Sequence, residues 1–243
     1  MNKKTQNEIL EIVKRNYSEI AGHYSETRKK KIWPELEELT KKIKNGDKIL
    51  DVGCGSGKLL QALENKEIDY YGVDSCREIL DNAEEINKNK GGGERKFAKG
   101  DILNLGDIPE VNFDYVFCIA VLHHLPGKNL QIQAIKQLKN KIKLGGEIVL
   151  SVWNLWSDNL INKKKKFKKQ IFKFLFLKII GKNKMDFGDV LFDWKNSKGE
   201  ITSKRYYHAF TKRQLKKISK KAGLKIKKIY KDKYNYYLTL NKK

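Results

Sequence analysis

Apolar residues recur along the chain in two patterns, as short continuous runs and at helical spacing. The continuous runs predict strands at 48–52, 68–73, 95–98, 113–121 and 147–152. Helical spacing predicts helices at 5–16, 34–44, from Cys76 onward, 129–143 and 212–221. The last two apolar runs, 224–230 and 236–240, alternate with polar residues and predict an antiparallel hairpin.

This order of elements predicts an α/β fold. We expect a doubly wound, Rossmann-like sheet of seven mostly parallel strands, closed by the antiparallel hairpin. A chain of 243 residues of this class is expected to form a single domain. Its expected parts are an N-terminal cap of helices (1–46), a cofactor-binding core (47–157), a lysine-rich insertion (158–187) and a C-terminal helix with the closing strands (188–243).

A glycine-rich turn follows the first predicted strand, and a helix follows the turn. Gly53, Gly55 and Gly57 let the backbone approach a ligand closely. A dinucleotide fingerprint would have a third glycine at position 58, which is Lys58. A phosphate-binding loop of the Walker type would have glycine at 52 and Ser or Thr at 59, which are valine and leucine. Both phosphate interpretations are therefore weak.

Three carboxylates stand at or just after the ends of predicted strands. Asp51 lies at the end of the first strand, where it would repel a pyrophosphate but hold an ammonium group. Asp74 ends the second strand, where a carboxylate accepts ribose hydroxyls, and Ser75 follows it. Asp101 and Ile102 follow the third strand, where an acid can accept an adenine amino hydrogen. The pattern favours an adenosyl ligand that carries positive charge.

With these motifs the chain resembles the class I S-adenosylmethionine-dependent methyltransferases. That family has an Asp-x-Gly-x-Gly-x-Gly loop and an acid after each of strands two and three, and all three motifs occur here in order. The resemblance implies S-adenosyl-L-methionine as the cofactor. The residues implied to bind it are Asp51, Gly53, Gly55, Gly57, Asp74, Ser75, Asp101, Ile102 and Ala120.

The charge of the chain is concentrated in its C-terminal third. Residues 158–243 carry 27 Lys and Arg against 6 Asp and Glu, a net charge of +21, whereas residues 1–157 carry +2. This asymmetry indicates a polyanionic partner, either nucleic acid or an anionic membrane. A surface that is basic throughout, without such a partner, is the alternative. Phe167, Tyr206 and Tyr207 lie among the basic residues and would be able to stack on unpaired bases.

The three cysteines, at 54, 76 and 118, have no metal-binding spacing, and their number is odd. We expect a reducing compartment, no structural disulfide and no metal site. No apolar run approaches the roughly 20 residues of a membrane-spanning helix. Together these features predict a cytoplasmic protein.

Candidate chemistry lies at the ends of strands four and five. His123 and His124 follow strand four, and because adjacent residues cannot face one direction, we expect one to face the substrate and the other to be structural. Trp153 and Asn154 end strand five at the same edge. An amine, hydroxyl or carbon nucleophile would need a histidine as base. A carboxylate nucleophile is already ionised at pH 7 and would need only positioning.

A second resemblance extends over nearly the whole chain, except for about 158–185. It is to the tRNA wobble-uridine carboxymethyl methyltransferases, which esterify 5-carboxymethyluridine in tRNA. The segments that carry it are Tyr17 to Arg28, Ile119 to Leu125, Asp193-Trp194-Lys195, Arg205 to Phe210 and Asp232 to Tyr237. The chain departs from the family at Asp193, where a proline is usual, and in the lysine-rich insertion.

This resemblance implies roles for residues outside the cofactor loop. Its candidates for catalysis are His123, His124 and Arg28. Arg205, Tyr207, His208 and Trp153 are the candidates for substrate binding, with a structural ion pair as the alternative for Arg205 and a hydrogen-bonded structural role as the alternative for His208. The implied partners are tRNA and, as in eukaryotic members, a small activator subunit.

Two other functions compete with RNA methylation. The first is O-, N- or C-methylation of a quinone- or lipid-like small molecule, with residues 161–182 as an amphipathic anchor on an anionic membrane. The second is a non-catalytic binder that keeps the cofactor as a structural ligand, which the three intact carboxylates argue against. The acceptor atom and the oligomeric state do not follow from the sequence.

Overall fold

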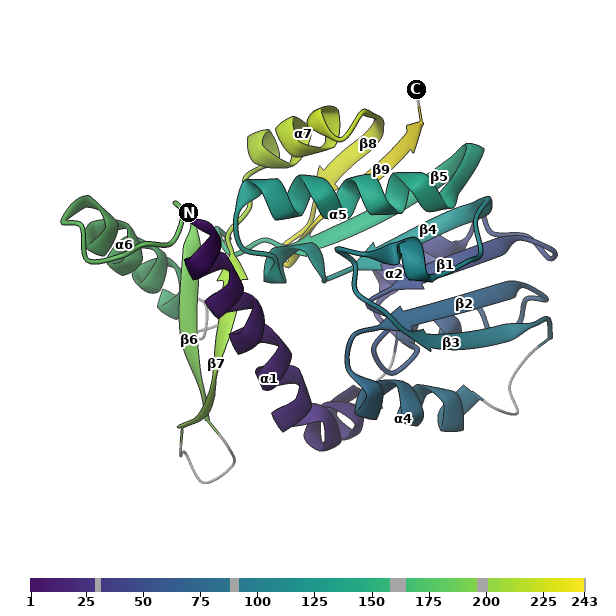
Figure 1. Cartoon of the computed structure of the whole chain (residues 1–243). Helices are drawn as coiled ribbons and strands as arrows, with labels where there is room; N and C mark the ends of the chain where they lie inside the picture. The colour runs from purple at the N-terminus through teal and green to yellow at the C-terminus, as the bar shows by residue number, and fades with distance from the viewer. Residues whose placement is uncertain (29–31, 88–91, 158–164, 196–200, 243) are drawn as a thin grey trace.

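The computed structural model describes residues 1–28, 32–87, 92–157, 165–195 and 201–242 (Figure 1). Side chains 20–28, 165–167, 194, 195 and 202 also lie outside the described part. The expectations for Arg28 and Phe167 rest on such side chains.

The predicted seven-stranded sheet is confirmed. Its strand order is β3-β2-β1-β4-β5-β9-β8, in which the first five strands are parallel and β9 and β8 are antiparallel. The strands are β1 (Lys48–Val52), β2 (Asp69–Asp74), β3 (Arg95–Lys99), β4 (Phe113–Ile119), β5 (Ile142–Trp153), β8 (Leu224–Lys231) and β9 (Asn235–Lys242). The order reverses between β1 and β4, and ligands of doubly wound folds bind at the carboxyl ends of such strands.

Helices cover both faces of this sheet (Figure 1). They are α2 (Pro34–Thr40), α3 (Lys58–Gln61), α4 (Arg77–Asn87), α5 (Lys128–Lys141) and α7 (Lys212–Lys221), with 3₁₀ turns η1 (Leu105–Asp107) and η2 (Leu122–His124). Two clusters of buried apolar side chains pack on the sheet, one containing Val116 and Leu150 and the other Phe117 and Val149. Alternate residues of one strand thus serve opposite cores, as the pleat requires.

Local signals set several helix ends as expected. Pro34 is the first residue of α2, where its missing N–H costs nothing. Thr211 caps α7 through a reciprocal capping box with Gln214. The helix predicted over 129–143 ends earlier than expected, because α5 ends at Lys141 and β5 begins at Ile142, ahead of Gly145 and Gly146. Ile142 pairs with Phe113 across a register shift that accommodates the glycines within the strand.

The N-terminal helix α1 (Lys3–Arg28) is longer than the predicted 5–16. It contacts β7 and α4, and Ile9 packs with Met185 and Tyr206. Farther along the helix, Tyr17 packs against Cys76 and against Ile79 of α4. Tertiary contacts therefore extend the helix along the edge of the sheet, beyond what the periodicity of its first half indicated.

The segment between β5 and α7 contains a helix and two strands that the sequence did not predict. Helix α6 (Lys165–Ile179) is followed by an antiparallel ribbon of β6 (Asp189–Lys195) and β7 (Ile201–His208). The ribbon forms a separate two-stranded sheet. Ile171 of α6 packs against it, in a cluster with Leu155, Val190 and Tyr207. No helix among the described residues is long and apolar enough to span a bilayer.

Candidate active site

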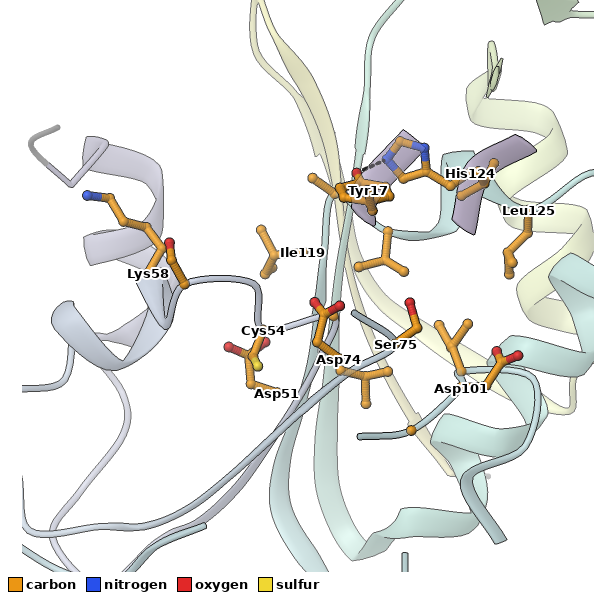
Figure 2. A pocket seen from close by; sticks show the side chains of 18 of the residues that line it. Tyr17, Asp51, Cys54, Lys58, Asp74, Ser75, Asp101, Ile119, His124 and Leu125 are labelled. Atoms are coloured by element: carbon orange, nitrogen blue, oxygen red, sulfur yellow. Dashed lines mark hydrogen bonds between the residues drawn. The ribbon is translucent and has the colours of Figure 1, made fainter. Parts of the chain in front are cut away.

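A cavity of about 490 Å³ lies at the carboxyl ends of the central strands, between the sheet and α1. Figure 2 shows the carboxylates of Asp51, Asp74 and Asp101 on one side of it, with the Tyr17–His124 pair across from them. Its other lining residues include Leu10, Lys14, Trp33, Gly53, Cys54, Ser75, Lys99, Ile102, Ala120, Val121 and Trp153. The predicted cofactor residues are thus brought to one place, with Gly55 and Gly57 in the adjoining turn.

The glycine turn adopts a backbone that side chains would disturb. Gly53, Gly55 and Gly57 have φ values of 76°, 55° and 73°. The N–H groups of Gly53 and Cys54 both donate to the carbonyl of Val73, at 2.6 and 3.1 Å. A Cβ at Gly53 would lie 2.2 Å from Cγ2 of Val121. The turn is therefore closely packed against Val121. Ala120, the preceding residue, has a φ of 60°.

Asp51 lies at the buried base of the cavity. Its side chain accepts a hydrogen bond from the Tyr70 hydroxyl at 2.8 Å, and the residue is only 2% exposed. Burial raises the pKa of Asp51 to about 7, the Tyr70 hydrogen bond opposes this rise, and the nearby Asp74 adds to it. The carboxylate is thus costly to ionise in the free protein and would be stabilised by a cationic ligand.

Asp74 and Asp101 differ from Asp51 in their hydrogen bonds. Asp74 accepts from the backbone N–H groups of Gly55 and Cys76, each at 3.0 Å. Burial raises the pKa of Asp74, against the effect of these donors. Asp101 is exposed and accepts from the N–H of Leu103 at 2.8 Å. Backbone bonds orient both carboxylates, and each oxygen retains the capacity to accept from a ligand.

His124 faces the cavity and pairs with Tyr17 of α1. The Tyr17 hydroxyl lies 2.8 Å from Nε2 of His124, and Nδ1 lies 3.3 Å from the Tyr206 carbonyl oxygen. The carbonyl can only accept, so Nδ1 carries the proton and Tyr17 donates to Nε2. Burial lowers the pKa of His124 to about 4, the Tyr206 hydrogen bond opposes this, and the charge of Arg205 adds to the lowering. The imidazole is therefore neutral at pH 7.

His123 is fully buried and does not line the cavity. Its Nδ1 accepts from the backbone N–H of Trp153 at 3.3 Å, and burial lowers its pKa well below the usual value. It packs among the rings of His124, Trp153 and Tyr207. Of the two adjacent histidines, the structure thus places one toward the cavity and one within the core.

Trp153 alone of the four predicted substrate residues lines the cavity. Its ring stacks on Tyr207, with the centroids 4.9 Å apart. Tyr206 and Tyr207 are 1% and 4% exposed, so the expectation that they stack on unpaired bases is wrong. Arg205 is half-buried on β7, opposite Phe192, and lies outside the cavity wall.

His208 belongs to a buried polar network behind the cavity. Its Nδ1 donates to Asp189 at 2.6 Å, and the Tyr206 hydroxyl donates to the same carboxylate at 2.7 Å. Nε2 of His208 lies 3.4 Å from the Gln214 amide nitrogen, which can donate to it. His208 therefore holds β6, β7 and α7 together, which is the structural alternative for this residue.

Several cavity residues were not predicted as site residues. Tyr17 begins a segment that carries the second resemblance but was given no role in the site, and Leu10, Lys14 and Trp33 also reach the cavity. Their only sequence signal was the placement of these segments in an N-terminal cap. Among the described residues there is no cluster of His, Cys, Asp or Glu that would hold a metal ion, and Cys54, Cys76 and Cys118 are free thiols.

The fold and cavity define the class: a doubly wound α/β protein that receives an adenosyl-type ligand beside a glycine turn and strand-end carboxylates. The sequence matches the family described as "Methyltransferase domain" over residues 43–223. The chain belongs to this methyltransferase domain family. The fold and enzyme class predicted from the sequence are confirmed.

Individual relatives agree with this assignment. The tRNA (carboxymethyluridine(34)-5-O)-methyltransferase of Schizosaccharomyces pombe is 28% identical over 242 residues, 96% of each chain. Other curated relatives are longer, and this chain covers 20–49% of their length. Among solved structures, an S-adenosylmethionine-dependent methyltransferase of Methanosarcina mazei has a TM-score of 0.67 at 21% identity, covering 88% of this chain and 99% of that one.

A further solved structure with the same fold is a Haloferax volcanii methyltransferase in complex with the Trm112 methyltransferase activator. The similarity has a TM-score of 0.62 at 13% identity and covers 94% of this chain and 96% of that chain.

Proposed function

We propose that the protein transfers a methyl group from S-adenosyl-L-methionine to a carboxymethyl group on the wobble uridine of tRNA. The observation that carries the donor assignment is the convergence of Asp51, Asp74 and Asp101 from three strand ends into one cavity. The full-length similarity to the S. pombe enzyme supports the acceptor assignment. The +21 charge of residues 158–243 is in keeping with a polyanionic substrate.

The cavity fits the chemistry of this donor. Asp51 is a buried carboxyl group whose pKa burial raises to about 7, so the ammonium group of the donor would favour its ionised form. Asp74 is held by two backbone donors and would accept the ribose hydroxyls. Asp101, beside Ile102, would accept from the adenine amino group. When bound, the donor would supply a methyl group on a sulfonium: an oxygen nucleophile would form a bond to the methyl carbon as the carbon–sulfur bond breaks, and the neutral thioether would leave.

The chain's own residues then have to position an anionic oxygen and exclude water. A carboxylate nucleophile is already ionised at pH 7, so no side chain needs to remove a proton. Tyr17 and His124 offer a neutral, hydrogen-bonded surface across the cavity from the carboxylates. A neutral contact can position the nucleophile without strongly stabilising its charge in the ground state. Strong stabilisation of that charge would slow the methyl transfer. We infer that His124 acts by positioning and that His123 supports Trp153.

We also propose a cytoplasmic location and a small activator subunit as a partner. The activator proposal is supported by the fold shared with the H. volcanii methyltransferase that is bound to Trm112. It predicts that co-expression with such a subunit raises the methyltransferase activity or the solubility of the chain. Equal activity and yield with and without the subunit would contradict it. The three free, buried thiols suit a reducing compartment.

Transfer of a labelled methyl group tests the acceptor. The chain, alone and with an activator subunit, is incubated with labelled S-adenosyl-L-methionine and with either total tRNA or a membrane extract. We expect label in tRNA, and we expect mild alkali to release it as methanol because the product is an ester. Asp74→Asn should abolish labelling, and Leu144→Ser, at an exposed residue outside the cavity, is the control. Alkali-stable label would exclude an ester, and label only in the lipid phase would favour a small lipid-like acceptor.

A further inference from the structure

Apolar side chains on and directly after α6 are exposed and do not belong to the buried core. Nine large apolar residues are exposed in the described part of the chain, and four of them fall within residues 172–180. They are Phe172, Phe176, Ile179 and Ile180, at 59%, 61%, 74% and 45% exposure. Single exposed apolar residues are ordinary, but a contiguous group marks an interaction surface.

These residues lie on one side of the helix together with lysines. At 100° per residue, Phe172, Phe176, Ile179 and Ile180 fall within an arc of about 120°. The exposed Lys169 and Lys173 fall within the same arc, and the exposed Lys182 and Lys184 follow the end of the helix. No acidic residue occurs between 159 and 185. We call the set Lys169, Phe172, Lys173, Phe176, Ile179, Ile180, Lys182 and Lys184 the α6 outer face.

The opposite side of α6 is already occupied. Ile171 is 1% exposed and packs with Val190 and Tyr207, and Phe174 reaches both this cluster and that of Met185. Figure 1 shows α6 on the outer side of the β6–β7 ribbon, at the periphery of the molecule. None of the residues of the outer face lines the cavity. The surface is therefore separate from the proposed active site.

The composition of the outer face favours a lipid surface over a protein partner. Protein interfaces are enriched in aromatic residues and Arg but depleted in Lys, whereas four of the eight residues of this face are lysines. A second copy of the chain would bring the same lysines together, and like charges oppose such contact. Bases would stack on Phe172 and Phe176, but the two isoleucines offer no ring face. Helices that lie on membranes combine apolar residues with lysines.

We propose that the α6 outer face docks the protein on an anionic membrane surface. Phe172, Phe176, Ile179 and Ile180 enter the boundary between headgroups and acyl chains, and the lysines contact anionic headgroups. The proposed contact is made by one face of a helix that lies in the plane of the interface. The proposal does not depend on the acceptor of the methyl group.

Vesicle flotation of the full chain tests this docking. The probes are phosphatidylcholine vesicles with and without phosphatidylserine, at low and high salt. We expect binding only to the anionic vesicles, weakened by salt. Phe172→Ser combined with Phe176→Ser should lower the vesicle partition coefficient at least about tenfold, because both rings leave the apolar boundary. Lys169→Glu combined with Lys173→Glu should lower it more than about fivefold for each lysine.

Matched control variants distinguish vesicle binding by the α6 outer face from nonspecific binding by exposed apolar or basic residues elsewhere on the surface. Leu144→Ser replaces an apolar side chain that is 81% exposed on β5, and Lys216→Glu with Lys220→Glu reverses two exposed charges on α7. Both controls should bind vesicles more tightly than the α6 variants do. Methyl transfer to free substrate should be unchanged in the variant with Phe172→Ser and Phe176→Ser, and the thermal unfolding of both α6 variants should match that of the unmodified chain.

Two results would overturn the proposal. One is equal binding of anionic vesicles by the unmodified chain and the serine variant. The other is a loss of tRNA affinity in the serine variant without a loss of vesicle binding, which would assign the face to RNA.

Discussion

Replacing Asp51 by asparagine tests whether the charge of this buried side chain destabilises the free protein and strengthens binding of S-adenosyl-L-methionine. Asparagine has nearly the same shape but no charge, so it can keep a hydrogen bond with the Tyr70 hydroxyl that lies 2.8 Å away. The pKa of Asp51 is about 7 in the folded protein, against 3.8 as its ordinary value. The folded state therefore holds this proton more tightly than the unfolded chain does.

The sign of the pH dependence follows from this difference. Below pH 4 both states carry the proton, and Asp51 has no net effect on the free energy of unfolding. Between about pH 4 and 7 only the unfolded state releases it, so the free energy of unfolding falls as pH rises. Above pH 7 the full cost is reached, and a pKa difference of about three corresponds to about 4 kcal/mol. Asp51→Asn should therefore stabilise the free protein by about 2–4 kcal/mol at about pH 8, and by much less near pH 5.

The same substitution should weaken donor binding. Losing a charge-assisted hydrogen bond of about 1.5–3 kcal/mol would raise the dissociation constant of S-adenosyl-L-methionine roughly ten- to hundredfold. In the unmodified chain, donor affinity should rise as pH increases through about 7, because Asp51 loses its proton there. The variant should lack that rise.

Chemical denaturation at the two pH values, with and without donor, measures both effects, and calorimetry gives the dissociation constants. Asp101→Asn serves as the control, because Asp101 lies in the same cavity but is exposed. It should change the free energy of unfolding less than Asp51→Asn does, because Asp101 is exposed. A variant at position 51 that is less stable than the unmodified chain at pH 8, or a difference in stability that does not vary with pH, would contradict a cost of ionising Asp51 in the folded protein.

Three other substitutions probe separate contacts. Gly53→Ala places a Cβ 2.2 Å from Cγ2 of Val121 at a φ of 76°, so donor binding by calorimetry should be lost and stability should fall by about 1–3 kcal/mol; unchanged binding would show that the turn is loose. Tyr17→Phe removes the hydroxyl that donates a hydrogen bond to His124, and it should lower kcat about tenfold without changing the affinity for S-adenosyl-L-methionine. A loss of that affinity with an unchanged kcat would contradict a positioning role. Asp189→Asn leaves two buried donors with a weaker acceptor and should lower the free energy of unfolding by about 3 kcal/mol in urea, while a loss below 1 kcal/mol would show that the network is dispensable.

Much of the donor cavity was predictable because parallel strands impose their own geometry. The carboxyl ends of adjacent parallel strands meet at one edge, so residues just after strands converge whatever the loops do. Asp51, Asp74 and Asp101 are 50 residues apart in sequence from first to last, yet they line one cavity. The substrate side was less predictable. Its contacts join α1, η2 and β7, whose relative placement is set by packing across long separations, as between Tyr17 and His124.

The doubly wound fold, the glycine turn, the three carboxylates and the imbalance of charge could all be predicted from the sequence, because each depends on local pattern and on the rules of parallel sheets. The position of His124 rather than His123 at the cavity, and the burial of Tyr206 and Tyr207, required the folded structure. The folded structure also decided that α6 and the β6–β7 ribbon pack together and leave a basic, apolar helix face outside. These features depend on which segments meet in space, and local periodicity carries no information about such distant partners.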